Sequence, residues 1–204
     1  MTLALFAKSL AMGLAVAAPL GPIGALCVSR TLERGFRAGM AGGLGTALAD
    51  AVYATLAALG FAVFAAALAR VDPMLRIGGG AFMLWLGWRS LAPPPGPRAA
   101  EAAGGVAATA AATFLLTLAN PMTALTFAAL FAGMGLAAAP GAEAVVVAGV
   151  FLGSLLWWAI LAGGVSLARA RLPEGFARWT ARASGALLIL FGIWAIATAL
   201  ARAW

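Results

Sequence analysis

Charged residues are scarce in this chain. Only 9% of its 204 residues are Asp, Glu, Lys or Arg, against roughly 25% in an ordinary soluble domain. Hydrophobic residues make up 64% of the chain, and its mean hydropathy is +1.04. A surface in contact with water needs more polar groups than this composition can supply. The composition therefore excludes a soluble globule and predicts a protein whose solvent is a lipid bilayer.

Histidine is absent, and cysteine occurs once, at Cys27. Without histidine the chain lacks the commonest zinc ligand and the usual haem ligand. One cysteine cannot form an internal disulfide or a redox pair, so we interpret it as a small buried apolar residue. The sequence also has no GxxxxGK[ST] loop for nucleotide phosphates. These absences predict a protein that is not an enzyme and that holds no metal or other cofactor.

Six apolar segments are long enough to cross a bilayer, which takes about 20 residues. They cover 3–28, 38–68, 74–91, 106–136, 144–167 and 183–200. We expect an all-α integral membrane protein with six transmembrane helices. The net charge of +7 is then a property of membrane loops and does not indicate nucleic-acid binding.

The Lys and Arg residues are distributed unevenly over the connections between these segments. The first, third and fifth connections hold Arg30, Arg34, Arg37, Arg89, Arg98, Arg169, Arg171, Arg178 and Arg182. The opposite side holds Lys8, Arg70, Arg76 and Arg202. Because cytoplasmic loops are rich in Lys and Arg, the distribution predicts a multi-pass protein with its odd connections in the cytoplasm and both termini outside.

The two halves of the chain contain similar segments in the same order, which indicates an internal duplication. Segment 22–26 matches 121–125, and segment 80–87 matches 185–192. Between them, Gly45, Asp50 and Tyr53 correspond in that order to Gly149, Ser154 and Trp157. A unit of three spans that is repeated once enters the membrane from opposite sides. We therefore expect a 3+3 inverted repeat, with repeats at 1–92 and 106–204 and a Pro/Gly-rich cytoplasmic linker at 93–105.

Helix-breaking residues stand at matching places in the first and fourth predicted spans, at Gly21-Pro22 and Asn120-Pro121. Each proline removes a backbone donor, and the freed backbone groups must be satisfied by protein or line a water-filled cavity. Paired interruptions of this kind indicate the binding site of a transporter, where helix ends face the charged groups of a substrate. A simple proline kink in each helix is the other interpretation.

Asp50 is the only acidic residue deep inside a predicted span, near the middle of the bilayer. A carboxyl group there costs about 2.5 to 3.5 kcal/mol on insertion scales. We therefore predict that Asp50 couples transport to a proton or a cation, or receives a substrate ammonium group. A carboxyl group that only joins two helices is the structural alternative. The residues predicted to bind substrate are Gly21, Pro22, Thr46, Asn120, Pro121, Thr123, Ser154 and Trp157.

Several segments resemble the lysine exporter (LysE/RhtB) family of bacterial amino-acid exporters. The similar features are Gly21-Pro22, the Arg-Gly-Phe-Arg-Ala-Gly run at 34–39, Gly45 with Asp50, the segment 80–89, Asn120-Pro121 with 127–131, and Gly185 with Gly192. The resemblance covers nearly the whole chain. It implies a secondary transporter of the bacterial inner membrane that exports amino acids or related small metabolites, coupled to proton entry.

The chain departs from the family pattern at Ile23, Gly24 and Ala49. Many members carry polar residues just after the first Gly-Pro, and a glycine directly before the aspartate. Both departures lie near the expected site, so the resemblance does not extend to lysine or arginine as the substrate. The expected partners are a small-molecule substrate and the lipid bilayer, without nucleic acid. Self-association stays open, as do two other functions: an inorganic-ion transporter or channel, and a membrane assembly subunit that transports nothing.

Overall fold

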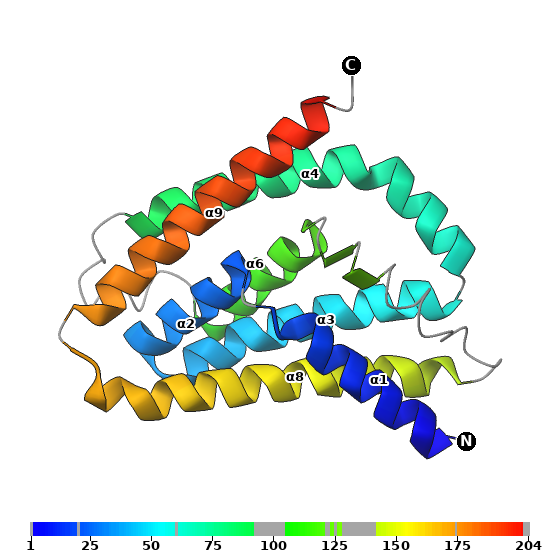
Figure 1. Ribbon diagram of the computed structural model, residues 1–204, viewed down its shortest axis with the longest axis horizontal. Helices are drawn as coiled ribbons and strands as arrows, with labels where there is room; N and C mark the ends of the chain where they lie inside the picture. The colour runs from blue at the N-terminus through cyan, green and yellow to red at the C-terminus, as the bar shows by residue number, and fades with distance from the viewer. Residues whose placement is uncertain are drawn as a thin grey trace.

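The computed structural model describes residues 2–19, 21–59, 61–91, 105–120, 123–124, 126–127, 142–173 and 175–201. This part of the chain is helical and contains no strand (Figure 1). Its elements are α1 (Thr2–Ala17), α2 (Pro22–Arg34), α3 (Phe36–Leu59), α4 (Phe61–Leu91), α6 (Val106–Leu118), α8 (Glu143–Ala168), the 3-10 turn η1 (Arg169–Arg171) and α9 (Phe176–Ala201). The predicted all-α fold is confirmed for these residues.

Several helices are long and apolar enough to cross a membrane. Among the described residues these are α3, α8 and the part of α9 from Arg178 to Ala201. The pair formed by α1 and α2 passes the same test as one bent span, with an angle of 81° between its two parts. The shorter α6 is also apolar. The helices support a membrane-spanning protein.

Several predicted span boundaries are wrong. The first span was expected to end at 28 and the third to begin at 74, but α2 runs to Arg34 and α4 begins at Phe61. The second span was expected to reach residue 68, but α3 ends at Leu59 and α4 begins at Phe61; a glycine, a poor helix former, stands between them in the sequence. The last span was expected to begin at 183, but α9 begins at Phe176. Arg178 and Arg182 are exposed, so their long side chains can reach water from an otherwise apolar helix.

Arg76 lies in α4 and is only 2% exposed. The sequence analysis counted it among the cations of the outer side. Its Nη1 donates a hydrogen bond of 3.2 Å to Thr198 Oγ1 on α9, and its guanidinium lies 6.0 Å from the centre of the Trp194 ring. Arg76 therefore joins α4 to α9 inside the protein.

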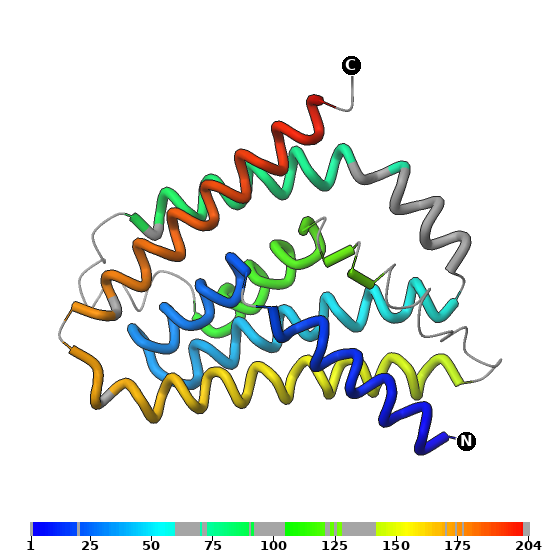
Figure 2. The backbone as a smooth tube through the Cα atoms, in the orientation of Figure 1, coloured from blue at the N-terminus to red at the C-terminus, as the bar shows by residue number. Residues whose placement is uncertain are grey.

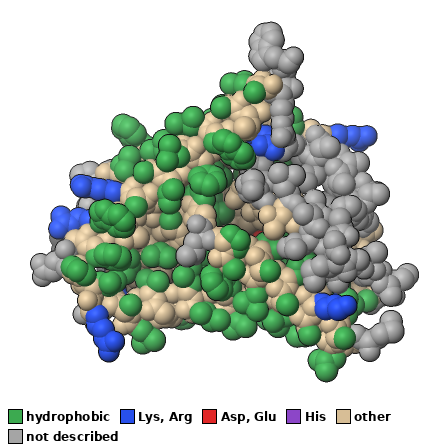
Figure 3. All heavy atoms as spheres, viewed as in Figure 1, with side chains coloured by type: hydrophobic (Ala, Val, Ile, Leu, Met, Phe, Trp, Pro, Cys, Tyr) green, Lys and Arg blue, Asp and Glu red, His purple; other side chains and the backbone are tan. Residues whose placement is uncertain are grey.

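The helices run between two ends of the molecule. In Figures 1 and 2 the start of α1, the end of α3 and the start of α8 lie toward the right, which we call the termini end. The turn from α2 to α3, the turn from α8 to α9 and the last turn of α4 lie toward the left, which we call the turn end. Hydrophobic side chains cover much of the face between the two ends, and Lys and Arg side chains gather mainly near the ends (Figure 3). This distribution suits a protein whose middle lies in lipid.

Glycines bring pairs of helices into backbone contact. A Cβ atom at Gly80 of α4 would lie 2.8 Å from the carbonyl oxygen of Gly192 in α9, and one at Gly192 would lie 2.7 Å from the carbonyl oxygen of Gly80. On α8, a Cβ atom at Gly149 would lie 2.6 Å from Ser9 Cβ of α1. Small residues permit this close approach in membrane proteins. The most extensive helix contacts are α4 with α9, α1 with α8, and α3 with both α8 and α6.

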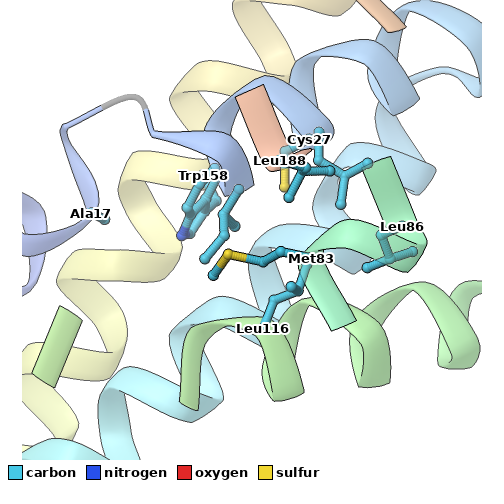
Figure 4. Close-up of a cluster of buried hydrophobic side chains, with 9 residues drawn as sticks. Ala17, Cys27, Met83, Leu86, Leu116, Trp158 and Leu188 are labelled. Atoms are coloured by element: carbon cyan, nitrogen blue, oxygen red, sulfur yellow. The ribbon is translucent and has the colours of Figure 1, made fainter. Parts of the chain in front are cut away.

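Two clusters of buried apolar side chains fill the interior. The termini-side cluster comprises Met12, Tyr53, Ala54, Ala57, Ala124, Phe127, Val146 and Val150. The turn-side cluster, most of which is labelled in Figure 4, comprises Ala17, Ile23, Leu26, Cys27, Met83, Leu86, Leu116, Trp158 and Leu188. The turn-side cluster joins side chains from α1, α2, α4, α6, α8 and α9. The region between the two clusters holds the polar residues described next.

Candidate functional site

The chain breaks between α1 and α2. Helix α1 ends at Ala17, and α2 begins at Pro22, where a proline suits the first helical position because no N–H is needed there. Gly21 precedes α2 in an extended conformation (φ −86°, ψ −162°) and provides no side-chain cap. The first N–H groups of a helix have no intrahelical acceptor. The start of α2 therefore presents backbone donors and the positive end of a helix dipole.

The end of α6 comes close to this break. Helix α6 ends at Leu118, and the N–H of Asn120 donates a hydrogen bond of 3.2 Å to the carbonyl oxygen of Thr117. The hydroxyl of Tyr53 on α3 donates a hydrogen bond of 2.7 Å to the carbonyl oxygen of Leu118. The last carbonyl groups of α6 form the negative end of that helix. Pro121, the second residue of this predicted break, lies outside the described residues.

A cavity of about 70 Å³ lies between these helix ends. Its polar lining comes from Thr46 and Asp50 on α3, Thr117 on α6, and Asn120 and Thr123 beyond it. The other lining residues are Val16, Ala17, Pro19, Gly21, Pro22, Ile23, Gly24 and Trp158. The cavity thus combines a carboxyl group with one helix start and two helix ends.

The cavity lies between the two apolar clusters along the helix axes. On α8, Val146 and Val150 belong to the termini-side cluster, and Trp158 belongs to the turn-side cluster. Ser154 lies between them. On α3, Asp50 precedes Tyr53 of the termini-side cluster by one helical turn. Either route from the cavity along these helices therefore meets a packed apolar cluster.

Asp50 is 1% exposed. Its Oδ2 accepts a hydrogen bond of 2.7 Å from Ser154 Oγ on α8. Its Oδ1 is buried and has no hydrogen-bond partner among the described residues. A buried carboxylate oxygen without a partner is costly. Because Asp50 lines the cavity, this oxygen is available to a proton or to a ligand that donates a hydrogen bond.

Trp158 provides a second buried polar atom without a partner. The residue is 4% exposed, lines the cavity, and its indole N–H has no acceptor among the described residues. Indole N–H groups normally find an acceptor when they are buried. The site therefore offers one unpaired acceptor, Asp50 Oδ1, and one unpaired donor, Trp158 Nε1.

The structure brings most of the predicted site residues together. Gly21, Pro22, Thr46, Asp50, Asn120 and Thr123 all line the cavity, although they come from distant parts of the sequence. Ser154 does not line it and reaches the site through Asp50. Trp157 lies outside the lining and packs, partly buried, against the turn-side cluster.

Thr117 and Trp158 also line the cavity, although neither was among the residues predicted to bind substrate. Trp158 follows Ser154 by four residues, so the two share one face of α8, and this spacing could have selected it over Trp157. Thr117 stands one helical turn after Thr113 and just before the break at Asn120. Its hydroxyl also bonds the Thr113 carbonyl oxygen within α6, at 2.8 Å.

The chain matches the family model described as "LysE type translocator" over residues 14–198. It is 33% identical over 172 residues to a protein of Escherichia coli (strain K12) named "Uncharacterized membrane protein YahN", with 81% of this chain and 77% of that protein covered. It is 26% identical over 200 residues to a protein of Bacillus subtilis (strain 168) named "Putative amino acid efflux protein YcgF", covering 93% and 94% of the two chains. No solved structure matches the chain. The family match spans most of the sequence, including every residue that lines the cavity. The chain therefore belongs to the LysE type translocator family, whose members are membrane transporters.

Proposed function

We propose that this protein exports amino acids or related small metabolites from the cytoplasm, coupled to proton entry. The observation that carries the proposal is the buried Asp50, whose Oδ1 has no partner among the described residues and which lines a cavity at a helix break. Membership of a transporter family and the name of the Bacillus relative, "Putative amino acid efflux protein YcgF", support the same function.

The electrostatics of the cavity suit a zwitterion. The ammonium group of an amino acid would lie against Asp50 Oδ1 and the carbonyl ends of α1 and α6. The carboxylate would lie against the start of α2 and the N–H of Trp158. Pro22, the first residue of α2, and Trp158 both line the cavity. Helix starts favour anions and helix ends favour cations. An α-amino acid carries both charges at the short separation that a cavity of about 70 Å³ allows.

The two apolar clusters would act as gates. In alternating access, a central site opens to one side of the membrane at a time. Loosening the turn-side cluster would open the cavity toward the turn end, and loosening the termini-side cluster would open it toward the termini end. Tyr53 and Phe127 stack with ring centres 5.4 Å apart within the termini-side cluster, so their separation would accompany opening on that side.

Reciprocal packing supports the inverted repeat. If residues 1–92 and 106–204 are equivalent repeats, α1 corresponds to α6 and α3 corresponds to α8. The contacts fit this, because α1 packs along α8 and α6 packs along α3. The matched glycines follow the same rule, since Gly149 contacts Ser9 of α1 and Gly45 contacts Ala110 of α6. Asp50 and its predicted equivalent Ser154 hydrogen-bond to each other. In this arrangement α1 with α2 forms the first span, and α6 begins the fourth.

The proposed sidedness follows the basic residues. The turn end carries exposed Arg34, Arg37, Arg89, Arg178 and Arg182, so it would face the cytoplasm, and both termini would lie outside the bacterial inner membrane. The linker at 93–105 would then be cytoplasmic. Substrate would enter the cavity past the turn-side cluster and leave past the termini-side cluster.

Counterflow in proteoliposomes tests the proposal. Purified wild-type protein and Asp50→Asn would be compared for exchange of each of the twenty radiolabelled L-amino acids, with and without an imposed pH gradient. We expect gradient-stimulated flux of at least one amino acid in the wild type, and a loss of at least about tenfold in Asp50→Asn, because asparagine cannot carry a proton between the two sides.

Two controls make the result interpretable. A single symmetrical peak in size-exclusion chromatography establishes that Asp50→Asn is folded. Measurement of Na⁺, K⁺ and Cl⁻ flux in the same vesicles tests the inorganic-ion alternative. Gradient-driven flux of an amino acid that is undiminished in Asp50→Asn, or ion flux with no amino-acid flux, would contradict the proposal.

A further inference from the structure

The proposed function leaves open how substrate and proton are made to move in opposite directions. We propose that the coupling proton and the ammonium group of the substrate occupy the same oxygen, Asp50 Oδ1, and exclude each other. This inference rests on the proposed function and concerns the order of events at the same site.

The surroundings of Asp50 support a shared oxygen. Oδ2 is already bonded to Ser154 Oγ, at 2.7 Å, so only Oδ1 is left for a ligand. The cavity that Asp50 lines has a volume of about 70 Å³. In this confined space we place the substrate ammonium group in direct contact with Oδ1.

No other charged group in the described part of the cavity can neutralise Asp50. The titratable groups on the described helices around it are Lys8 on α1, Cys27, Arg30, Glu33 and Arg34 on α2, Arg37 and Tyr53 on α3, and Glu143 on α8. None of them lines the cavity, and α6 carries none. The Tyr53 hydroxyl donates its hydrogen bond to the Leu118 carbonyl oxygen. Arg30, near the far end of α2, donates a hydrogen bond to Thr109.

An ionised Asp50 facing an empty cavity is therefore the most costly state of the site, because a buried charge without a partner is strongly unfavourable. Two events avoid it. When substrate binds from the cytoplasm, the O–H bond of the Asp50 carboxyl breaks, its proton passes to water, and a carboxylate–ammonium pair forms. When a proton arrives from outside, it forms that O–H bond again, and the substrate leaves with its own ammonium protons. Each cycle exchanges one substrate for one proton.

Trp158 would fix the other end of the substrate. Its buried N–H lacks an acceptor among the described residues, and the residue lines the same cavity as Asp50. With the substrate carboxylate placed there and at the start of α2, the ammonium group is directed toward Oδ1. Trp157 is a matched comparison, because its N–H is also buried without a partner in the described chain, yet the residue does not line the cavity.

Calorimetry measures the exchange directly. Each amino acid that shows counterflow is titrated into the detergent-solubilised full chain in two buffers of different ionisation enthalpy. We expect release of close to one proton per substrate where Asp50 is protonated, and an apparent Kd that rises about tenfold for each unit by which the pH falls in that range. For L-alanine, propionate lacks the ammonium group and should release no proton, whereas ethylamine keeps it and should.

The variants separate a shared oxygen from a structural role of Asp50. Asp50→Asn should bind substrate without proton release. Trp158→Phe keeps the ring and removes the N–H, so it should raise the apparent Kd by about tenfold or more while proton release stays near one. Trp157→Phe should change the Kd less than about twofold.

The failure of this inference differs from the failure of the proposed function. If no amino acid shows counterflow, the proposed function is wrong. If amino acids exchange but wild-type binding releases no proton at any pH, proton and substrate use different groups and the shared oxygen is wrong. If Na⁺ rather than a proton is displaced, the calorimetric signal will follow Na⁺ concentration and not buffer identity, which also overturns the inference.

Discussion

The two helices on either side of the first break are held in different ways. Helix α1 lies on α8 through direct backbone contact. A Cβ atom at Gly153 would meet the backbone of Leu10, and lie 3.0 Å from the nitrogen of Leu14. The buried hydroxyl of Ser9 in α1 donates a hydrogen bond within its own helix, to the Leu5 carbonyl oxygen. This half of the span is thus fastened to α8 by close packing.

Helix α2 packs side chains, Thr31 and Cys27 among them, closely against glycines of α3, and it also has several separate polar contacts to other elements. Arg30 Nη1 donates to Thr109 Oγ1 on α6, at 3.0 Å. Arg169 Nη2 of η1 donates to the carbonyl oxygen of Glu33, at 3.2 Å, and Ser184 Oγ of α9 donates to that of Ala25, at 2.7 Å. Hydrogen bonds contribute about 0.5 to 1.5 kcal/mol each and can be exchanged one at a time.

The difference indicates which half of the broken span can move. Close backbone packing is lost all at once, because protein interiors resist small deformations, so α1 should follow α8 as one body. Polar contacts at the end of α2 can break singly and be replaced by water. Since α2 also supplies Ile23, Leu26 and Cys27 to the turn-side cluster, we expect α2 to be the part that opens this gate. The following changes test that contrast, from the largest expected effect to the smallest.

Replacing Gly153 with leucine should have the largest effect. The new side chain would collide with the α1 backbone, and overpacking that the structure cannot relieve costs about 3 kcal/mol or more. We expect loss of the folded monodisperse protein in detergent, measured by size-exclusion chromatography and thermal unfolding.

Gly164→Leu is the matched control for that variant. It makes the same change on the same helix, at a position where a Cβ atom would meet nothing within 4 Å. Stability close to wild type is expected. If both substitutions lower the stability equally, the close contact between α1 and α8 is not what makes Gly153 sensitive to substitution.

Removing the hydroxyl of Thr109 should have an intermediate effect. Thr109→Val conserves shape but leaves Arg30 Nη1 without this acceptor, which should cost about 1 to 2 kcal/mol because the donor is charged. Transport should persist, with a changed rate, since α2 is then less firmly held. A double-mutant cycle with Arg30→Gln measures the coupling between the two side chains, and a coupling energy near zero would contradict the tether.

Ser184→Ala should have the smallest effect on stability, about 0.5 to 1 kcal/mol, because the hydroxyl is neutral and shares its one proton between the Ala25 carbonyl oxygen and that of Thr180 within α9. Thr55→Ala serves as the control, since the Thr55 hydroxyl bonds Ala51 in its own helix and joins no second element. We expect Ser184→Ala to alter transport rate more than Thr55→Ala does. The opposite order would argue against a mobile α2.

Much of the site could be predicted from sequence because its signals are rare. An acidic residue inside an apolar span is rare, because placing its charge in the membrane costs free energy. Gly-Pro and Asn-Pro are also distinctive, because they interrupt an apolar helix and leave backbone groups that need partners. Asp50, Gly21, Pro22 and Asn120 were selected on those grounds, and they line one cavity.

The remaining features depend on three-dimensional packing that sequence patterns do not record. Trp157 and Trp158 are adjacent and chemically identical. The rotation of α8 about its axis decides which one lines the cavity, and in the sequence only the four-residue spacing from Ser154 points to Trp158. Arg76 was interpreted as a loop cation, yet it is buried against Thr198 and Trp194, far along the chain. The end of α3 at Leu59 was missed because no charged residue or proline separates α3 from α4, and a single glycine is a weak break signal in a glycine-rich chain.

The most direct test of the account is an experimental structure of the full chain with a transported amino acid bound. The account predicts density for the amino acid in the cavity between Asp50 and Trp158, with its ammonium group within hydrogen-bond distance of Asp50 Oδ1 and its carboxylate toward the start of α2. Density at another place in the protein, with Oδ1 bonded only to protein groups, would contradict the claim that this cavity is the transport site.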